Sequence, residues 1–183
     1  MGSGDVRKAL LKLAQSLEAL GIPYAIAGAM ALNEFGYVRA TSVVDVLLTA
    51  KGLGAFKDAY LGRGYVEKFP GSRGLRDTEH GVTIDVLLTG DYPGDGKPKA
   101  ICFPDPAIAI RGERVALLPL EKLIELKLAS GLSAPHRLRD LADVQELVKH
   151  AKLPRAVGDR LDESVRAKFH ELWDAAQFVD PEE

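Results

Sequence analysis

The sequence predicts an α/β or α+β fold, in which a small mixed β-sheet is flanked by helices and followed by a helical C-terminal part. Runs rich in Val and Leu at 41–49 and 82–88 have the length and composition of strands. Beyond Pro119, apolar residues recur at helical spacing. The 183 residues are expected to form a single compact domain, with a core at 5–118 and the helical part at 119–180 packed on it.

The chain up to residue 88 is predicted to alternate helices with short strands. Asp5 is a candidate N-cap for the first helix, and Gly28 lies at a strand-to-helix turn. The expected helices cover 5–20, 28–35 and 54–61. The expected strands cover 24–27, 41–49, 65–69, 74–77 and 82–88.

The rest of the chain is predicted to be a loop, a short β segment and then helices. Two prolines and three glycines make 90–99 a loop. Residues 107–117 allow one or two short strands around a turn. The expected helices cover 120–130, 135–151 and 162–178.

Composition excludes several classes of protein. The 24 Lys and Arg nearly balance the 26 Asp and Glu, so there is no global basic field for non-specific nucleic-acid binding. The lone Cys102 excludes an internal disulfide. No apolar run approaches the roughly 20 residues that span a bilayer, and no signal-peptide core is present. We therefore expect a cytoplasmic protein without a membrane partner.

Asp45 and Asp85 are the strongest candidates for chemistry. Each lies in an apolar strand, where a carboxylate is costly unless it is paired, hydrogen-bonded or bound to a metal. Each is followed by Val-Leu-Leu-Thr, which favours one shared site over two structural acids that cap neighbouring loops. Such a pair suits Mg²⁺ and a nucleotide. Positions 43 and 45 share one strand face, but Val43 occupies the place of a second aspartate there.

Several other residues are candidates for phosphate binding. Gly28 and Ala29 leave backbone N–H groups free to meet an anion, although tight helix packing is the alternative. Lys127 falls within an apolar helix stripe and points inward, either to bind phosphate or to snorkel to water. Asp140 can pair with this lysine, in a functional or a purely structural contact. Arg39, just before the acidic strand, is well placed to reach a phosphate.

Taken in order, these segments resemble the nucleotidyltransferase superfamily. The likeness is greatest to the minimal AbiEii-type nucleotidyltransferases of bacterial toxin–antitoxin systems, and it covers about residues 5–150. The resemblance implies transfer of a nucleoside monophosphate from a nucleoside triphosphate (NTP) substrate to an acceptor hydroxyl on RNA or protein. It also implies Mg²⁺ as the cofactor and a cognate antitoxin as a partner. The segments that carry it are 27–32, 36–41, Asp45, 82–85, 120–127 and 137–143.

The resemblance also implies the roles of individual residues. Asp45 and Asp85 match catalytic, metal-binding carboxylates, and Asp85 matches the one that helps activate the acceptor hydroxyl. Val43 stands where the family has the first aspartate of Asp-x-Asp. The implied nucleotide-binding residues are Gly28, Ala29, Arg39, Thr41, Lys127 and Asp140.

The valine leaves three readings open. Losing most of the stabilisation from a bridging carboxylate slows the chemistry by roughly three orders of magnitude or more, unless Glu34, Asp77 or Glu79 substitutes as a ligand. Alternatively, the chain is a catalytically inactive, nucleotide- or partner-binding pseudoenzyme of a toxin–antitoxin pair. The third reading is that Val43 is an introduced or selected change that silences a harmful enzyme.

Overall fold

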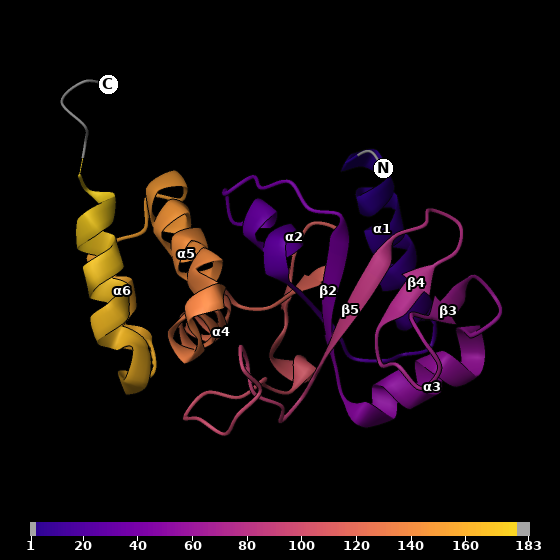
Figure 1. The fold of residues 1–183 in the computed structure, drawn as a ribbon. Helices are drawn as coiled ribbons and strands as arrows, with labels where there is room; N and C mark the ends of the chain where they lie inside the picture. The colour runs from indigo at the N-terminus through magenta and orange to yellow at the C-terminus, as the bar shows by residue number, and fades with distance from the viewer. Residues whose placement is uncertain (1–2, 179–183) are drawn as a thin grey trace. The chain divides into compact units, whose positions relative to one another are not determined.

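The computed structural model describes residues 3–178, which form two compact units (Figure 1). The first unit contains the described residues up to Glu34, together with Val38–Gly90 and Phe103–Pro119. The second contains Phe35–Tyr37, Asp91–Cys102 and the described residues from Leu120 onward. Residues 179 and 180 of the predicted helical part lie outside the described residues.

A mixed β-sheet forms the centre of the first unit. Within the described residues it has seven strands in the order β3-β4-β5-β2-β1-β7-β6. β2 and β5 run parallel, and each is antiparallel to its other neighbour, β1 and β4 respectively. Figure 1 shows β2, β5, β4 and β3 side by side. The strands are β1 Ala25–Ala27, β2 Val43–Leu48, β3 Tyr65–Glu67, β4 Leu75–Asp77, β5 Thr83–Leu88, β6 Ile110–Arg111 and β7 Ala116–Leu117.

Helices α1 (Ser3–Ala19) and α3 (Ala50–Tyr60) cover one face of this sheet. Phe56 of α3 is fully buried, and its ring lies edge-on to Tyr65 of β3 with 5.0 Å between ring centroids. Lys12 of α1 lies over the same Tyr65 ring. Because strand side chains alternate between faces, the fully buried Val44 and Ile84 point toward these helices. The main core of the first unit therefore lies between this face and the two helices.

Helix α2 (Gly28–Glu34) follows β1 without an intervening loop. The change of direction is made at Gly28, whose φ of 60° lies in the left-handed region that favours glycine. The next four residues, Ala29 to Leu32, are all buried. This confirms the predicted strand-to-helix turn.

The second unit is helical after Pro119. Its α-helices are α4 (Leu120–Ser133), α5 (Leu138–His150) and α6 (Glu163–Ala176). Gly131 lets α5 approach α4 closely, because a Cβ there would lie 2.5 Å from the Leu141 side chain. Short 3₁₀ helices complete the elements at Pro106–Ile108 in the first unit, and at Pro135–Arg137 and Arg155–Arg160 in the second.

In the first unit, the starts of α1 and α3 differ from those expected. Asp5 is not an N-cap, because α1 already begins at Ser3 and Asp5 lies in its first turn. Helix α3 begins at Ala50 rather than residue 54, because the Thr49 side chain accepts a hydrogen bond from the Gly52 N–H at 2.9 Å and caps the helix there. In residues 3–178, no helix is both long enough and apolar enough to cross a membrane.

Candidate active site

Asp45 and Asp85 lie directly opposite each other on the parallel strands β2 and β5. Neighbouring strands are about 4.8 Å apart and paired residues point to the same face, so the two carboxyl groups are side by side. Both residues are partly exposed, and the Asp85 side chain retains 44% of its accessible surface. They point away from the face covered by α1 and α3. The predicted adjacency of the two acids is therefore confirmed.

The backbone at Gly28 lies against the carboxylate of Asp45. Ala27 is the cross-strand partner of Asp45, so the turn that follows it begins beside that side chain. A Cβ at position 28 would lie 2.0 Å from Asp45 Oδ2, so any side chain there would displace this carboxylate. Gly28 is thus required both by its positive φ and by close approach to a candidate metal ligand. Ala29 is buried in α2, and its nucleotide-binding role stays a prediction.

Val43 shares the face of Asp45, two residues earlier on β2. It pairs with Thr83 and is half-buried. Its side chain has no oxygen to offer a metal. The valine is therefore part of the same surface as the acid pair.

Lys68 is a residue of this region that the sequence argument missed. Its Nζ lies 3.0 Å from Asp85 Oδ1, and its side chain is 40% exposed. Lys68 immediately follows β3, one residue beyond Glu67. Because Glu67 pairs with Leu75, which points to the helix-covered face, Lys68 points to the face of the acid pair. The alternation of side chains along β3 could have indicated the direction of Lys68. Using it requires the pairing register of β3 with β4, which cannot be read from the sequence.

Arg39 and Thr41 lie in the segment that enters β2. The Thr41 hydroxyl donates to the Val43 carbonyl at 3.1 Å and accepts from the Val43 N–H at 3.2 Å. The Arg39 N–H donates to Asn33 Oδ1 at 2.7 Å, which ties the segment to the end of α2. These contacts hold the approach to the acidic strand. The nucleotide-binding roles of both residues stay predictions.

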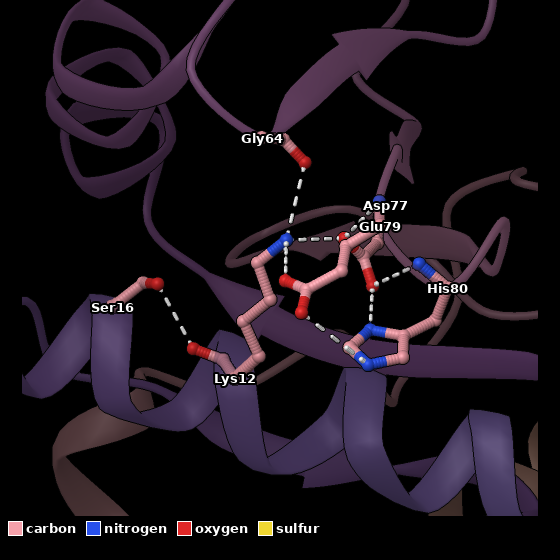
Figure 2. A network of polar contacts seen from close by, with 6 residues as sticks. All are labelled: Lys12, Ser16, Gly64, Asp77, Glu79 and His80. Carbon is pink, nitrogen blue, oxygen red and sulfur yellow. Dashed lines mark hydrogen bonds and ion pairs between the residues drawn. The ribbon is translucent and has the colours of Figure 1, made fainter.

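A second acidic cluster surrounds Asp77, which is fully buried (Figure 2). Its carboxylate accepts hydrogen bonds from Lys12 Nζ and from the backbone N–H of Glu79 at 3.1 Å, and it lies 2.6 Å from Nδ1 of His80. Glu79 Oε2 lies 3.1 Å from the same lysine nitrogen. Burial alone would raise the pKa of Asp77, but the hydrogen bonds from Lys12, His80 and Glu79 outweigh it, so its pKa lies below the ordinary value.

Asp77 and Glu79 are wrong as substitute ligands for the acid pair, because β4 directs Asp77 to the other face and Glu79 contacts Lys12 beside Asp77. Leu75 pairs with Ile84, so Asp77 shares the helix-covered face, whereas Asp85 points to the opposite face. Ligand atoms of Asp77, Glu79 and His80 lie within 4.8 Å of one another, but the Lys12 ammonium already lies among them. This cluster is an ion-pair network that joins α1 to the sheet.

Glu34, the third proposed substitute, is also poorly placed. It is exposed at the far end of α2, six residues after Gly28. At about 1.5 Å per residue, it lies roughly 9 Å along the helix from the turn that contacts Asp45. Glu34 is therefore separated from the acid pair by the length of α2.

Lys127 and Asp140 belong to the second unit, where they link two helices. Lys127 Nζ of α4 lies 3.1 Å from Asp140 and 2.8 Å from Asp143, both on α5. Ser130 also donates to Asp140 at 2.6 Å. Burial on its own would raise the pKa of Asp140, but the charge of Lys127 and the hydrogen bonds from Ser130 and Lys127 hold its pKa below the ordinary value.

These contacts show that the predicted Lys127–Asp140 pair exists, with Asp143 as an additional partner. Only 11% of the Lys127 side chain is exposed, and that of Asp143 is 3% exposed. The pair therefore has a structural function, because it neutralises buried charge between α4 and α5. A contact with nucleotide from either residue stays a prediction.

Comparison with known proteins identifies the fold. No protein-family model matches the sequence, and no curated protein matches it. The crystal structure of ANT(2")-Ia in complex with adenylyl-2"-tobramycin is similar, with a TM-score of 0.54 and 15% identity over 89% of this chain and 98% of that one. This chain has a nucleotidyltransferase-like fold.

Two other solved structures agree with this fold. A protein from H. pylori classed as a nucleotidyltransferase has a TM-score of 0.52 and 17% identity, over 97% of this chain and 95% of that one. The solution structure of the antibiotic-resistance factor ANT(2")-Ia has a TM-score of 0.50 and 14% identity, over 92% and 95%. At these identities the nucleotidyltransferase-like fold is what the chains share.

Proposed function

We propose that this protein is a nucleotidyltransferase that transfers a nucleoside monophosphate from an NTP to an acceptor hydroxyl. The observation that carries the proposal is the register of Asp45 with Asp85, on one partly exposed face and beside the bare backbone of Gly28. Two carboxylates at adjacent positions of a strand pair repel each other, which raises the affinity of this face for cations. The nucleotidyltransferase-like fold supports the same reading.

The two acids have defined roles in the proposed reaction. The acceptor oxygen bonds to the α-phosphorus, the bond from that phosphorus to the bridging oxygen breaks, and pyrophosphate leaves. Asp85 accepts the proton of the acceptor hydroxyl as a general base. Asp45 and Asp85 provide the hard oxygen ligands that Mg²⁺ prefers, and the bare Gly28 lets the Asp45 carboxylate lie against the turn. When bound, Mg²⁺ would neutralise charge on the phosphates.

The finer assignment concerns the acceptor and the biological role. We propose an AbiEii-type protein of a toxin–antitoxin pair, with RNA or protein as the acceptor and a cognate antitoxin as its partner. This rests on the sequence resemblance over residues 5–150. The structure of ANT(2")-Ia holds an adenylylated tobramycin, so an aminoglycoside hydroxyl is the alternative that the experiment must include.

A second candidate function is nucleotide or partner binding without transfer. Val43 removes one oxygen ligand from the acidic face, and the Lys68 ammonium pairs with Asp85. Both features reduce the attraction of this face for divalent ions. They favour a pseudoenzyme over an enzyme that needs two metal ions.

The test is transfer of label from α-³²P-labelled NTPs, in Mg²⁺, to cellular RNA, to protein and to tobramycin. The natural chain is compared with Val43→Asp and Asp85→Asn. We expect labelling of one acceptor class, an increase with Val43→Asp of up to roughly three orders of magnitude, and loss with Asp85→Asn.

Each outcome separates the candidates. Label that appears only with Val43→Asp identifies an inactivated enzyme. Binding of NTP without transfer in either chain supports the pseudoenzyme. If neither chain transfers label or binds an NTP, the nucleotidyltransferase proposal is wrong.

A further inference from the structure

Lys68 makes an ion pair with Asp85 that is more than a chance surface contact. An exposed ion pair alone is weak support for a role, because many contribute nothing measurable. Here neighbouring residues determine the direction in which the Lys68 side chain extends.

Gly74 opens that path. The Lys68 N–H donates to the Gly74 carbonyl at 3.0 Å, so the two residues face each other across the base of the β3–β4 connection. A Cβ at position 74 would lie 2.6 Å from Cδ and 3.4 Å from Cγ of Lys68. The lysine stem thus runs across the bare glycine backbone. Gly74 does not have a positive φ, so its lack of a side chain serves this contact.

The loop that contains Gly74 is braced from the other side. Lys57 of α3 donates to Glu67 Oε1 at 2.7 Å and to the Ser72 carbonyl at 2.6 Å. The other carboxylate oxygen of Glu67 accepts from the Gly71 N–H at 2.8 Å. The Ser72 side chain accepts from the Gly74 N–H at 3.0 Å. Four hydrogen bonds thus brace the loop that begins at Lys68.

The charges on this face differ from those of a site with three aspartates. Asp45, Asp85 and Lys68 sum to minus one, whereas three aspartates would sum to minus three. A two-metal site needs enough negative charge to hold both ions. With Val43 and Lys68 the face has less negative charge than such a site. The Lys68 ammonium has three N–H donors, of which Asp85 accepts one.

We propose that Lys68 is a phosphate-binding residue of this site. Its ammonium contacts both Asp85 and the phosphate chain. In a site with three aspartates, a second divalent ion would supply this positive charge. The inference rests on the proposed function, since it assumes that a nucleoside triphosphate binds this face. It predicts that triphosphate binding does not require Mg²⁺.

The test measures binding of α,β-methylene ATP by titration calorimetry, in EDTA and in Mg²⁺. The corresponding analogues of GTP, CTP and UTP are screened in the same way, so that a different base preference is not mistaken for a lack of binding. In EDTA we expect Lys68→Met to weaken binding by roughly tenfold to a hundredfold, as for loss of a hydrogen bond between charged groups. Mg²⁺ should recover part of this loss, because Asp85 is then free to hold the ion. The ratio of Kd in EDTA to Kd in Mg²⁺ therefore rises in Lys68→Met relative to the natural chain.

Matched variants separate this role from general effects. Lys51→Met removes an exposed lysine from α3 on the covered side of the sheet, and should leave both constants within about twofold. Gly74→Ala should weaken binding in EDTA in the same direction as Lys68→Met, because it displaces the lysine stem. Gly54→Ala, where a Cβ meets nothing within 4 Å, is its control.

The outcomes distinguish this inference from the proposed function. If the natural chain binds the analogue but Lys68→Met behaves like Lys51→Met, or the Kd ratio does not change, the inference is overturned while the nucleotidyltransferase proposal stands. If no analogue binds with or without Mg²⁺, both are overturned. Binding that depends on Lys68 without any transfer supports the inference and contradicts the transfer reaction.

Discussion

The two faces of the central sheet hold aspartate in opposite ways. On the face covered by α1 and α3, Asp77 is fully buried, is paired with the Lys12 ammonium and lies within hydrogen-bond distance of His80. On the other face, Asp45 and Asp85 lie side by side and partly exposed. A buried acid with a complete set of partners stabilises a fold, whereas two adjacent acids that solvent can reach are suited to bind a cation or a substrate. Position on a strand, more than residue type, separates the two roles.

Asp85→Asn gives the largest expected effect, and it should be an effect on activity alone. Loss of a general base lowers the transfer rate by about 10²- to 10⁴-fold. Because this side chain is 44% exposed, the free energy of unfolding should change by no more than about 0.5 kcal/mol. Labelling assays and urea unfolding measure the two quantities. A stability loss as large as that of the Asp77 cluster variants would remove the contrast between the faces.

Lys12→Met tests the covered face and should affect stability alone. It removes a cation from a fully buried carboxylate, and breaking a buried pair costs about 3–5 kcal/mol. Urea unfolding measures the loss. Lys8→Met, an exposed lysine on the same helix, is the matched control. At temperatures where the variant is folded, its nucleotide affinity should equal that of the natural chain, and a selective loss of affinity would place Asp77 in the site after all.

Gly28→Ala is expected to affect both properties, because the turn contacts the acid pair. A non-glycine residue at a φ of 60° costs about 1–3 kcal/mol, and the new Cβ must also displace the Asp45 carboxylate. Urea unfolding should show a lower free energy of unfolding, and nucleotide titration should show weaker binding. Gly54→Ala, within α3, should raise stability by up to about 1 kcal/mol. Equal behaviour of the two glycine variants would contradict the close contact at Asp45.

Acidification should reveal the covered face through a smaller effect. The pKa of Asp77 is below its ordinary value in the folded state. Its contribution to stability is therefore fully present above the unfolded-state pKa, near 3.9, and is lost as pH falls through the lower folded-state pKa. Between about pH 5 and pH 2, the free energy of unfolding should fall by a smaller amount in Asp77→Asn than in the unsubstituted chain. Urea midpoints over this range provide the measurement, with the exposed Asp58→Asn as a control.

The sequence was sufficient for features that depend on local periodicity. The apolar strands around Asp45 and Asp85 are visible from composition, and a charged residue within each marks a candidate site. The inward position of Lys127 follows from helical spacing, and its pair with Asp140 was predicted from it. Each of these positions follows from the period of one element, and the Lys127–Asp140 pair needs in addition only that two consecutive helices pack together.

Features that depend on the register between strands could not be predicted in the same way. Asp77 was a possible ligand until its pairing placed it on the face opposite Asp85. Lys68 was overlooked because its direction depends on the β3–β4 register and on the bare Gly74. The start of α3 at Ala50 was missed because a Thr side chain, rather than the apolar pattern, sets it.

The parallel pairing of β2 with β5 also determines when the site can exist during synthesis. Parallel neighbours cannot be joined by a tight turn, and here α3, β3 and β4 lie between them in the chain. Such long-range pairing forms slowly compared with local structure. As the chain leaves the ribosome, Asp45 emerges well before Asp85, and until β5 joins the sheet neither carboxylate has its neighbour. Any activity that needs both acids is therefore withheld until this sheet is assembled.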